Sequence, residues 1–420
     1  MLIVQKYGGT SVASPEHIKE VAARVSATRG QGHQVVVVVS AMAGETDRLW
    51  SLARQVAGRP HERETDVLLA TGEQITASLM AMALRDQGDS AVSFLGHQVR
   101  IATDGAFGRA RIKRIDARRL LSVLAEGHIV VVAGFQGTDA RGNITTLGRG
   151  GSDTTAVALA AVLKADVCEI YTDVDGVYSA DPRICPQAAK LDRLSYDEML
   201  ELASLGAKVL QIRSVEFAKR YRVPVHVRSS FSLAEGTWVV EEEPTMEDVL
   251  ISGVTYDLDQ AKIRVLGVRD RPGLAAKLFR PIADAGIVVD MIIQNAGELG
   301  YADLTFTVPR GDCERALAEV REVASEIGAR GVSGEMDVAK VSIVGLGMRS
   351  HAGVAARMFE ALARAGINIE MISTSEIKIS VVVDVERAEQ AVQVLHDAFI
   401  ASGKRRGRPA GAGAGSPAGA

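Results

Sequence analysis

The chain has 420 residues, which predicts about two to three domains, and its 47% hydrophobic and 24% charged residues are typical of globular proteins. A formal net charge of −4 gives no electrostatic field that would favour nucleic acid or an anionic membrane, so neither is expected as a partner. Three widely spaced cysteines argue against a disulfide framework or a zinc site, and the first residues contain no signal-peptide segment, which favours a cytoplasmic protein that acts on small molecules.

Up to about Tyr221, short β-branched runs alternate with helical patterns. The runs cover residues 3–5, 35–39, 91–95, 129–133 and 167–171, and a further run follows at 225–227. Their continuous hydrophobicity predicts strands buried on both faces of a mainly parallel sheet, with helices as crossovers. Because ligands of such α/β sheets bind beyond the carboxyl ends of the strands, the residues that follow each run are the first candidates for a site.

The first two runs are each followed by a loop with glycine and polar residues. Lys6 leaves the first run beside two glycines, so it can reach a phosphoryl group while the backbone closes around that group. A solvated lysine before a turn is the alternative. The loop from Ser40 to Thr46 offers two hydroxyls and a glycine, which is a weak signal by itself.

Glu73 lies in a mostly apolar helical stretch, residues 67–84, directly beside Gly72. A glycine costs roughly 1 kcal/mol in a helix interior, so its presence here indicates that another group approaches the helix closely. Glu73 is either a solvated helix residue or the partner of a substrate ammonium group. We favour the second interpretation.

The stretch from Leu147 to Ala156 reads LGRGGSDTTA. Its glycines let backbone N–H groups approach an anion while Arg149 adds a positive charge. Ser152 or Asp153 is expected to cap a helix whose positive end faces the same ligand. Asp153 stands where a dinucleotide fingerprint has its last glycine, and no P-loop Lys-Ser or Lys-Thr follows, so the alternative is a plain glycine-rich turn before a helix.

The run at 167–171 is followed by a mixture of acceptor, aromatic and basic side chains. Asp175-Gly176 predicts a turn, and a hairpin is the alternative for that part. The mixture suits the base, ribose and phosphates of a nucleotide; its members are Asp173, Tyr178 and Arg183. Lys208 is expected near the start of a later helix.

The second half of the chain is an internal repeat. A charged run at 241–244 predicts a domain boundary, and beyond it residues 272–292 match residues 352–372, with Gly273 matching Gly353 at an offset of 80. Each copy reads strand, helix, strand, strand, the ferredoxin-like order. The expected units are 261–337 and 341–402, followed by a Gly/Ala/Pro-rich tail, 403–420, that is expected to be disordered.

The motifs at 6–11, 147–156 and 171–183, followed by the tandem repeat, together resemble the aspartate kinase family up to about Gly403. The resemblance implies a three-layer α/β/α amino acid kinase domain over 1–245, followed by two ferredoxin-like (βαββαβ) ACT domains. It also implies ATP-dependent phosphorylation of the side-chain carboxylate of L-aspartate to 4-phospho-L-aspartate, at the head of lysine, threonine and methionine biosynthesis.

The resemblance further implies roles for single residues. The catalytic residues are expected to be Lys6, Arg149, Asp153 and Lys208. The aspartate-binding residues are expected to be Thr46, Glu73, Arg149, Gly150, Gly151 and Ser152. The ATP-binding residues are expected to be Lys6, Tyr7, Gly8, Gly9, Ser40, Thr172, Asp173, Tyr178, Arg183 and Lys208. In these sets Lys6 stabilises the transferring phosphoryl group, Glu73 binds the substrate ammonium and Arg149 clamps a carboxylate.

The chemistry of this reaction agrees with the residues. A side-chain carboxylate with a pKa near ~4 is ionised at neutral pH, so it can attack a γ-phosphate without a general base. None of the eight histidines lies in the three motifs. We expect no protein metal site, because Mg²⁺ would be carried by the phosphates of ATP.

In relatives the ACT pair binds end-product amino acids, lysine, threonine or both. The positions that match effector sites are Asp270, Asp290, Gln294, Asn368, Ile369 and Thr374. The stretch from Gly297 to Ala302 lacks the threonine-bearing pattern common in relatives, which leaves the choice of effector open. A mere dimerisation module is the alternative for the repeat.

Two questions of assembly and activity stay open. Relatives of this length are often α2β2, with a small ACT-only subunit translated from an internal start, here Met246; a homo-oligomer is the other expectation. The alternative functions are another amino acid kinase of the same fold and an amino-acid sensor with a vestigial kinase domain.

Overall fold

The computed structural model describes residues 1–205, 209–242, 250–296, 300–346, 348 and 353–401. The chain divides into two compact units. The first comprises Met1–Tyr178 and Lys190–Met246, and the second comprises Ser179–Ala189 and Glu247–Ala420. Met246 and the tail 403–420 lie outside the described residues.

The first unit is built on an eight-stranded sheet with the order β10-β12-β11-β9-β1-β2-β6-β3. The strands are β1 (Leu2–Tyr7), β2 (Gln34–Val39), β3 (Ala91–Phe94), β6 (Ile129–Ala133), β9 (Val167–Thr172), β10 (Arg193–Ser195), β11 (Val225–Ser229) and β12 (Thr237–Val240). All neighbours pair in parallel except β11 and β12. The valine runs of β2 and β6 are buried on both faces, which confirms the predicted parallel α/β sheet.

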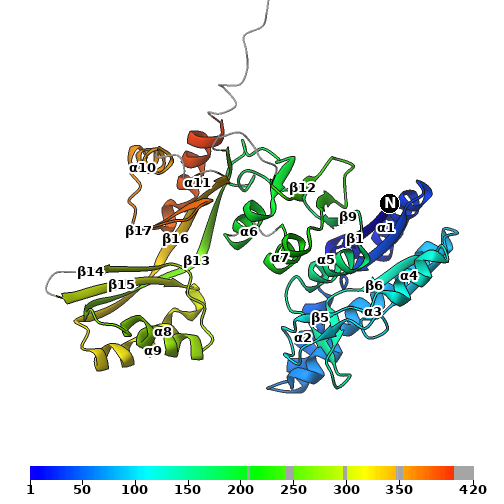
Figure 1. Cartoon of the computed structure of the whole chain (residues 1–420), viewed down its shortest axis with the longest axis horizontal. Coiled ribbons are helices and arrows are strands. Elements are labelled where there is room, and N and C mark those ends of the chain that lie inside the picture. Colours follow the sequence, from blue (N-terminus) through cyan, green and yellow to red (C-terminus); the bar gives the residue numbers. More distant parts are fainter. Residues whose placement is uncertain (206–208, 243–249, 297–299, 347, 349–352, 402–420) are drawn as a thin grey trace, which may run out of the picture. The chain divides into compact units, whose positions relative to one another are not determined.

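Helices cover both faces of this sheet (Figure 1). The helices are α1 (Pro15–Gly30), α2 (Glu45–Val56), α3 (Glu62–Asp86), α4 (Arg118–Ala125), α5 (Gly151–Leu163), α6 (Tyr196–Ser204) and α7 (Ile212–Tyr221). Apolar residues of α1 and α3 pack on the face that carries Val35, Val37 and Val39. Val157 of α5 and Val215 of α7 lie against the opposite face. The result is the expected three-layer arrangement.

A small four-stranded sheet, in the order β5-β4-β7-β8, adjoins α3. Its strands are β4 (Ala102–Thr103), β5 (Ile112–Arg114), β7 (Gln136–Thr138) and β8 (Ile144–Thr146). Asp66 of α3 ties it in place, because the Asp66 carboxylate accepts hydrogen bonds from the backbone N–H groups of Gly108 and Thr146. Helix α3 is long and apolar enough to span a membrane by length and composition alone, but its buried residues, such as Met80 and Leu84, belong to the core of this unit.

The second unit contains one six-stranded antiparallel sheet in the order β14-β15-β13-β16-β18-β17. Its strands are β13 (Leu250–Arg269), β14 (Ile292–Ala296), β15 (Tyr301–Val308), β16 (Gly331–Leu346), β17 (Met371–Thr374) and β18 (Lys378–Asp384). Its helices are α8 (Leu274–Asp284), α9 (Cys313–Ile327), α10 (Val354–Arg364) and α11 (Ala388–His396). Short turns of other helix types are η1 (Gly9–Val12) in the first unit and η3 (Arg310–Asp312), η5 (Val385–Arg387) and η6 (Asp397–Ala401) in the second.

The two repeats share the long strands β13 and β16. Residues 261–269 of β13 serve the first repeat, while residues 250–257 pair with the second half of β16 and supply the fourth strand of the second repeat. The first repeat is therefore inserted, in sequence, within the second. Each copy has the expected ferredoxin-like set of strands and helices, although the second takes one strand from upstream.

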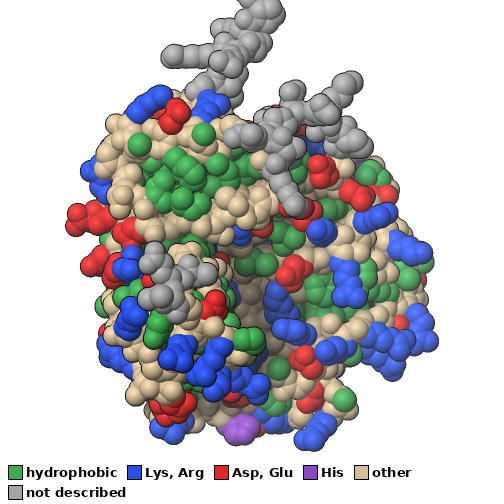
Figure 2. Space-filling view, turned by 60° about the vertical axis from the view of Figure 1, so that its left-hand side comes forward, with side chains coloured by type: hydrophobic (Ala, Val, Ile, Leu, Met, Phe, Trp, Pro, Cys, Tyr) green, Lys and Arg blue, Asp and Glu red, His purple; other side chains and the backbone are tan. Residues whose placement is uncertain are grey.

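Charged contacts cross between the two repeats at equivalent positions. Lys262 of β13 pairs with Glu370, and Lys340 of β16 pairs with Asp290. The lysine side chains are only 8% and 4% exposed. A small apolar cluster joins the repeats as well, formed by Met291, Val338, Met371 and Val382. Elsewhere on the surface, basic and acidic side chains are both spread over the face shown in Figure 2.

Candidate active site

A pocket of about 380 Å³ lies at the carboxyl ends of β1, β2 and β6 in the first unit. Residues from six separated parts of the chain line it. The lining includes these sequence-predicted residues: Lys6, Gly9, Ser40, Thr46, Glu73, Arg149, Gly150, Gly151, Ser152 and Asp153. The strand-end rule therefore leads to this place from Lys6 and from the loop at 40–46, and the glycine-rich stretch and Glu73 of α3 meet them there.

Lys6 and Asp153 form an ion pair in this pocket. Lys6 Nζ lies 2.6 Å from Asp153 Oδ1, and both side chains are about one-tenth exposed. Lys6 is the second-to-last residue of β1, and Asp153 lies in the first turn of α5. A lysine held in this way presents its remaining donors to the pocket from a fixed position.

The glycine-rich loop enters α5 differently from the sequence prediction. Gly150 is the N-cap residue, at φ +71, and none of the described side chains caps the helix; Ser152 and Asp153, the predicted caps, lie inside its first turn. A Cβ at Gly150 would lie 1.8 Å from Gln211 Cγ, so both the left-handed backbone and the close packing require glycine.

The uncapped start of α5 faces the pocket, and a second helix does the same. Helix α2 begins after Gly44, which is also left-handed at φ +78 and provides no side-chain cap, so that Thr46 lies in the first turn. Free N–H groups and the positive end of the helix dipole attract anions. Arg149 adds an exposed guanidinium to the same lining. The pocket is thus suited to a ligand with more than one negative group.

Glu73 supplies the opposite charge from a buried position. Its side chain is on α3, the residue is 3% exposed, and Glu73 Oε1 accepts a 3.0 Å hydrogen bond from the backbone N–H of Ala41. Glu73 Oε2 has no hydrogen-bond partner among the described residues. Burial raises the pKa of Glu73 to about 7. A cationic ligand group beside Oε2 would relieve this desolvation.

The close approach predicted beside Glu73 is confirmed. A Cβ at Gly72 would lie 2.8 Å from the Cβ of Ala41. Helix α3 therefore comes against the loop that follows β2, and this contact brings the Glu73 carboxylate to the Ala41 N–H. A Cβ at Gly9 would likewise lie 2.9 Å from the carbonyl oxygen of Ala41.

Several predicted nucleotide-binding residues lie outside the pocket lining. Thr172 Oγ1 donates to Asp173 Oδ1 over 3.0 Å, and the Tyr178 hydroxyl donates to Asp175 Oδ1 over 2.8 Å. Arg183 lies in the second unit, where it pairs with Asp181 at 2.6 Å. Lys208 lies outside the described residues.

Tyr7 and Gly8 continue β1 beyond Lys6. The Gly8 N–H donates to the carbonyl of Tyr171 over 3.3 Å, which joins the ends of β1 and β9. The Tyr7 side chain is fully buried and stacks on Tyr171 with ring centroids 4.7 Å apart, so only its backbone is available to a ligand.

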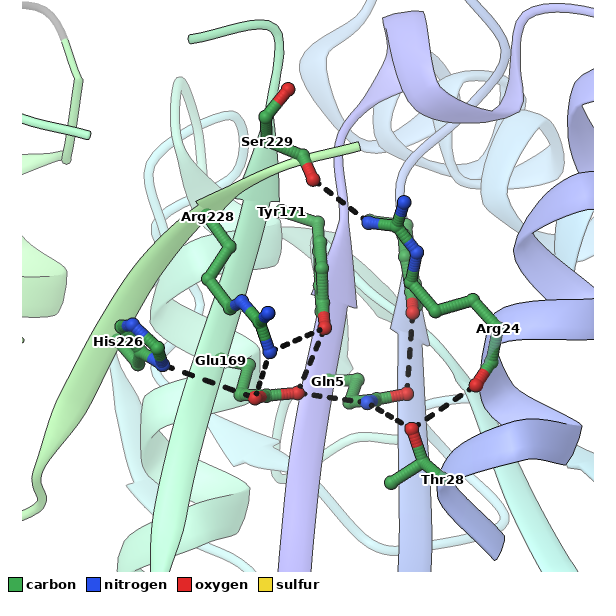
Figure 3. A network of polar contacts seen from close by, with 9 residues as sticks. Gln5, Arg24, Thr28, Glu169, Tyr171, His226, Arg228 and Ser229 are labelled. Carbon is green, nitrogen blue, oxygen red and sulfur yellow. Dashed lines mark hydrogen bonds and ion pairs between the residues drawn. The ribbon is translucent and has the colours of Figure 1, made fainter. Parts of the chain in front are cut away.

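A polar network lies beneath these strand ends (Figure 3). Glu169 of β9 accepts hydrogen bonds from Gln5 of β1 over 2.8 Å, from the Tyr171 hydroxyl over 3.1 Å and from Arg228 of β11 over 3.1 Å. Burial lowers the pKa of nearby His226 to about 4, so this histidine is neutral at pH 7. The network joins the three neighbouring strands that carry Lys6, Thr172 and Ser229.

Sequence reasoning missed some residues of the site. Phe135 lines the pocket in a left-handed conformation, φ +68, two residues after β6, so the strand-end rule could have found it. Gln211 also lines the pocket, and Arg213 holds the glycine-rich loop by donating to the carbonyl of Leu147 over 2.6 Å. Gln211 is the N-cap residue of α7 and Arg213 lies in its first turn, far along the chain, and no local pattern indicated them.

The predicted effector positions lie on both repeats. Gln294 Nε2 donates to Asp270 Oδ1 over 3.4 Å, and Asp290 is held by Lys340. In the second repeat Asn368 and Thr374 are exposed, while Ile369 packs against the core. The residues 297–299, part of the stretch that departs from the relatives' pattern, lie outside the described residues.

Three family models match the chain. The amino acid kinase family matches residues 1–229, and ACT domains match residues 262–328 and 341–399. The fold and the pocket therefore define an amino acid kinase that carries a pair of ACT domains.

Known relatives narrow this class. The chain is 57% identical to an aspartate kinase of Stutzerimonas stutzeri over 399 residues, which cover 95% of this chain and 97% of that protein. It is 52% identical to an aspartokinase of Mycolicibacterium smegmatis over 405 residues, 95% of this chain and 96% of that protein. Escherichia coli aspartokinase III, solved with aspartate and ADP, has a TM-score of 0.79 at 29% identity and covers 95% of this chain and 100% of its own. The chain belongs to the aspartate kinase family.

Proposed function

We propose that this enzyme transfers the γ-phosphoryl group of ATP to the side-chain carboxylate of L-aspartate, which gives 4-phospho-L-aspartate and ADP. The observation that carries the proposal is the pocket itself, where the unsatisfied Glu73 carboxylate lies in one lining with Arg149 and the Lys6–Asp153 pair. An α-amino acid with a second carboxylate matches this set of charges. The relative solved with aspartate and ADP supports the same substrates.

In the proposed reaction Glu73 binds the ammonium group of aspartate and Arg149 clamps a carboxylate. Thr46 and Ser152 contribute hydroxyl donors at the two helix N-termini, and Gly150 and Gly151 let the backbone approach the substrate closely. The reacting carboxylate is already ionised, so no general base is needed. Lys6, oriented by Asp153, neutralises charge that builds on the transferring phosphoryl group.

ATP is a substrate that brings Mg²⁺ on its phosphates. Among the described residues no group of three or more His, Cys, Asp or Glu side chains gathers to hold a metal ion, and a substrate-borne Mg²⁺ requires no such group. We assign the nucleotide side to the strand ends beside Lys6. The residues of the first unit proposed for it are Tyr7, Gly8, Gly9, Ser40, Thr172, Asp173 and Tyr178. Arg183, which belongs to the second unit, and Lys208, outside the described residues, stay predictions from the family resemblance.

Regulation is proposed to act through the ACT pair, with lysine, threonine or both as effectors. Escherichia coli aspartokinase III has also been solved with lysine and aspartate in a T-state, with a TM-score of 0.75 at 28% identity, covering 95% of this chain and 99% of its own. The proposed domains are 1–245, 261–337 and 341–402, and the proposed location is the cytoplasm. The proposed assembly is either a homo-oligomer or an α2β2 complex whose small subunit starts at Met246.

A screen of acceptors tests the proposed reaction. ADP release is measured with ATP and Mg²⁺ in the presence of L-aspartate, L-glutamate, N-acetyl-L-glutamate or carbamate. Of the four acceptors, we expect only L-aspartate to give ADP release. Release with another acceptor would make the chain a different amino acid kinase, and no release with any of them, together with retained binding of lysine or threonine, would indicate a sensor.

A further inference from the structure

The segment Ser179–Ala189 links the two units. The chain leaves the first unit after Tyr178 and returns to it at Lys190. The two crossings run side by side, because Tyr178 and Lys190 form an antiparallel bridge and the Leu191 N–H donates to the carbonyl of Val177 over 2.8 Å. Inside the second unit the Ser179 N–H donates to the carbonyl of Ala189 over 2.9 Å. We call Ser179–Ala189 the strap.

The strap is anchored in the core of the second repeat. Its residues Ala180, Ile184 and Cys185 are buried in one cluster with residues of β13, β16, α10 and α11. Such burial of apolar side chains fixes the segment more firmly than a surface loop. A chain segment that belongs by sequence to the kinase region is therefore part of the ACT core.

Hydrogen bonds fix the strap at both of its sides. The Val254 N–H donates to the carbonyl of Ser179 over 2.7 Å, and Gln393 Nε2 donates to the carbonyl of Ile184 over 2.8 Å. Ser179 Oγ lies 3.0 Å from Nε2 of His396, a residue of α11 that is 1% exposed. The same hydroxyl accepts a 2.9 Å hydrogen bond from the Ala189 N–H. Ser179, the first residue of the strap, thus connects it both to Ala189, its last residue, and to α11.

The residues directly before the strap are those proposed for the nucleotide. Thr172 ends β9, and the loop from Thr172 to Tyr178 leads without a break into Ser179. Val177 is held on the first unit by a 2.8 Å hydrogen bond from its N–H to Thr237 Oγ1. The strap is a direct covalent connection from the core of the second repeat to Tyr178 and Lys190.

We infer that the strap positions the nucleotide-side loop Thr172–Tyr178 from within the second ACT repeat, with Ser179 and His396 as positioning residues. The inference rests on the proposed function for the nucleotide assignment. A rearrangement of this repeat on effector binding reaches the kinase unit through the strap as a change in ATP affinity, while aspartate binding at Glu73 and Arg149 is spared.

Two strap variants test the inference, Ser179→Ala, which removes the hydroxyl contacts, and Ile184→Ala, which opens the anchor. Ile379→Ala, in β18 of the same core, is the matched control. We expect both strap variants to raise the KM for ATP at least about 5-fold, with an unchanged KM for aspartate and weaker inhibition by lysine plus threonine. The control keeps the ATP KM of the parent protein.

Amide hydrogen exchange gives a readout that is independent of the reaction. In ligand-free protein, exchange over residues 172–178 is expected to be faster in both strap variants than in the parent and the control. The inference is overturned if Ser179→Ala and Ile184→Ala change neither the exchange over 172–178 nor the KM for ATP. It is also overturned if Ile379→Ala changes both quantities as much as the strap variants do. If ADP fails to slow exchange over 172–178 in the parent protein, the nucleotide assignment fails instead, and the ligand-free comparison still decides the role of the strap.

Discussion

At the scale of single residues, Glu73 is a pocket residue whose charge changes near neutral pH. Burial raises its pKa to about 7, and the hydrogen bond from the Ala41 N–H offsets this only in part. A protonated Glu73 has no negative charge for an ammonium group. We therefore expect the KM for aspartate to rise as pH falls through about 7.

The variant Glu73→Gln isolates this charge. Hydrogen bonds to charged groups contribute about 1.5–3 kcal/mol, so the KM for aspartate should rise roughly 10- to 100-fold at pH 8. The same variant should lose the pH dependence of KM below pH 8, while the KM for ATP stays within about 2-fold. A pH-dependent KM that persists in Glu73→Gln would show that another group titrates.

The raised pKa of Glu73 also links pH to stability. The folded protein holds the Glu73 proton up to about pH 7, whereas the unfolded chain releases it near the ordinary value of 4.5. Between these values the folded state binds more protons, so the contribution of Glu73 to the free energy of unfolding falls as pH rises. Urea denaturation at pH 5 and pH 8 should show a smaller loss of stability in Glu73→Gln than in the parent, and an equal loss in both proteins would contradict this.

Lys6 is the second residue whose role can be measured directly. Replacing it by methionine keeps most of the side-chain volume and removes the charge that faces Asp153. By analogy with the loss of one oxyanion donor, kcat should fall about 10²- to 10³-fold. Lysine or threonine binding, followed by calorimetry, serves as the control for folding, and an unchanged kcat would refute the role of Lys6.

At the scale of elements, the contact between α3 and the loop after β2 shapes the pocket. In Gly72→Ala the new Cβ would lie 2.8 Å from Ala41 Cβ and push the helix away. Overpacking of this kind costs about 1–3 kcal/mol, which outweighs the gain of up to about 1 kcal/mol in helix propensity.

We therefore expect a lower melting temperature and weaker aspartate binding in Gly72→Ala. The matched control is Gly30→Ala, at the end of α1, where an added Cβ meets nothing within 4 Å. This control should be as stable as the parent or more so. Equal melting temperatures in both variants would mean that α3 can shift without cost.

Some helices and strands could be predicted from the sequence and others could not. Continuous apolar runs such as 35–39 correctly predicted buried parallel strands, because burial on both faces of a sheet requires consecutive apolar residues, and these can be read from the local sequence. The position of Lys6 at a ligand site followed from the rule that strand ends meet at one edge, whereas its meeting with the glycine loop and Glu73 was implied by the family resemblance. The sequence analysis placed the cap of α5 wrongly at Ser152 or Asp153, because both are good capping residues. The left-handed backbone at Gly150 and its close packing against Gln211 select the glycine instead.

Contacts between segments that lie far apart in the sequence could not be predicted. Residues 250–257 form a strand of the second repeat, but their partner lies some ninety residues later in β16, and no local pattern connects them. The burial of Ile184 in the ACT core and the hold of Arg213 on Leu147 depend in the same way on contacts between distant segments. Glu169, a carboxylate within a strand buried on both faces, was a signal in the sequence for the network of Figure 3.

At the scale of the whole molecule, two reciprocal ion pairs hold the ACT repeats together. Lys262 reaches Glu370 of the second repeat, and Lys340 reaches Asp290 of the first. Lys262→Met or Lys340→Met leaves an acidic side chain without its partner, which we expect to cost about 1–3 kcal/mol in the unfolding of the second unit.

Urea unfolding of the full chain measures this cost, and the matched control is Lys277→Met, an exposed lysine of α8. Both buried-lysine variants should unfold at lower urea than the control. Midpoints that match the control would mean that the apolar cluster around Met291 and Val382 suffices to join the repeats.

The central claim concerns the reaction of the whole chain and is tested most directly by trapping its product. Full-length protein is incubated with ATP, Mg²⁺, L-aspartate and hydroxylamine, and the aspartyl hydroxamate is measured without effector, with lysine, with threonine and with both. We predict hydroxamate that requires both ATP and aspartate, is lost in Lys6→Met, and decreases with lysine, threonine or their combination. A well-folded protein that forms no hydroxamate from aspartate would contradict the account.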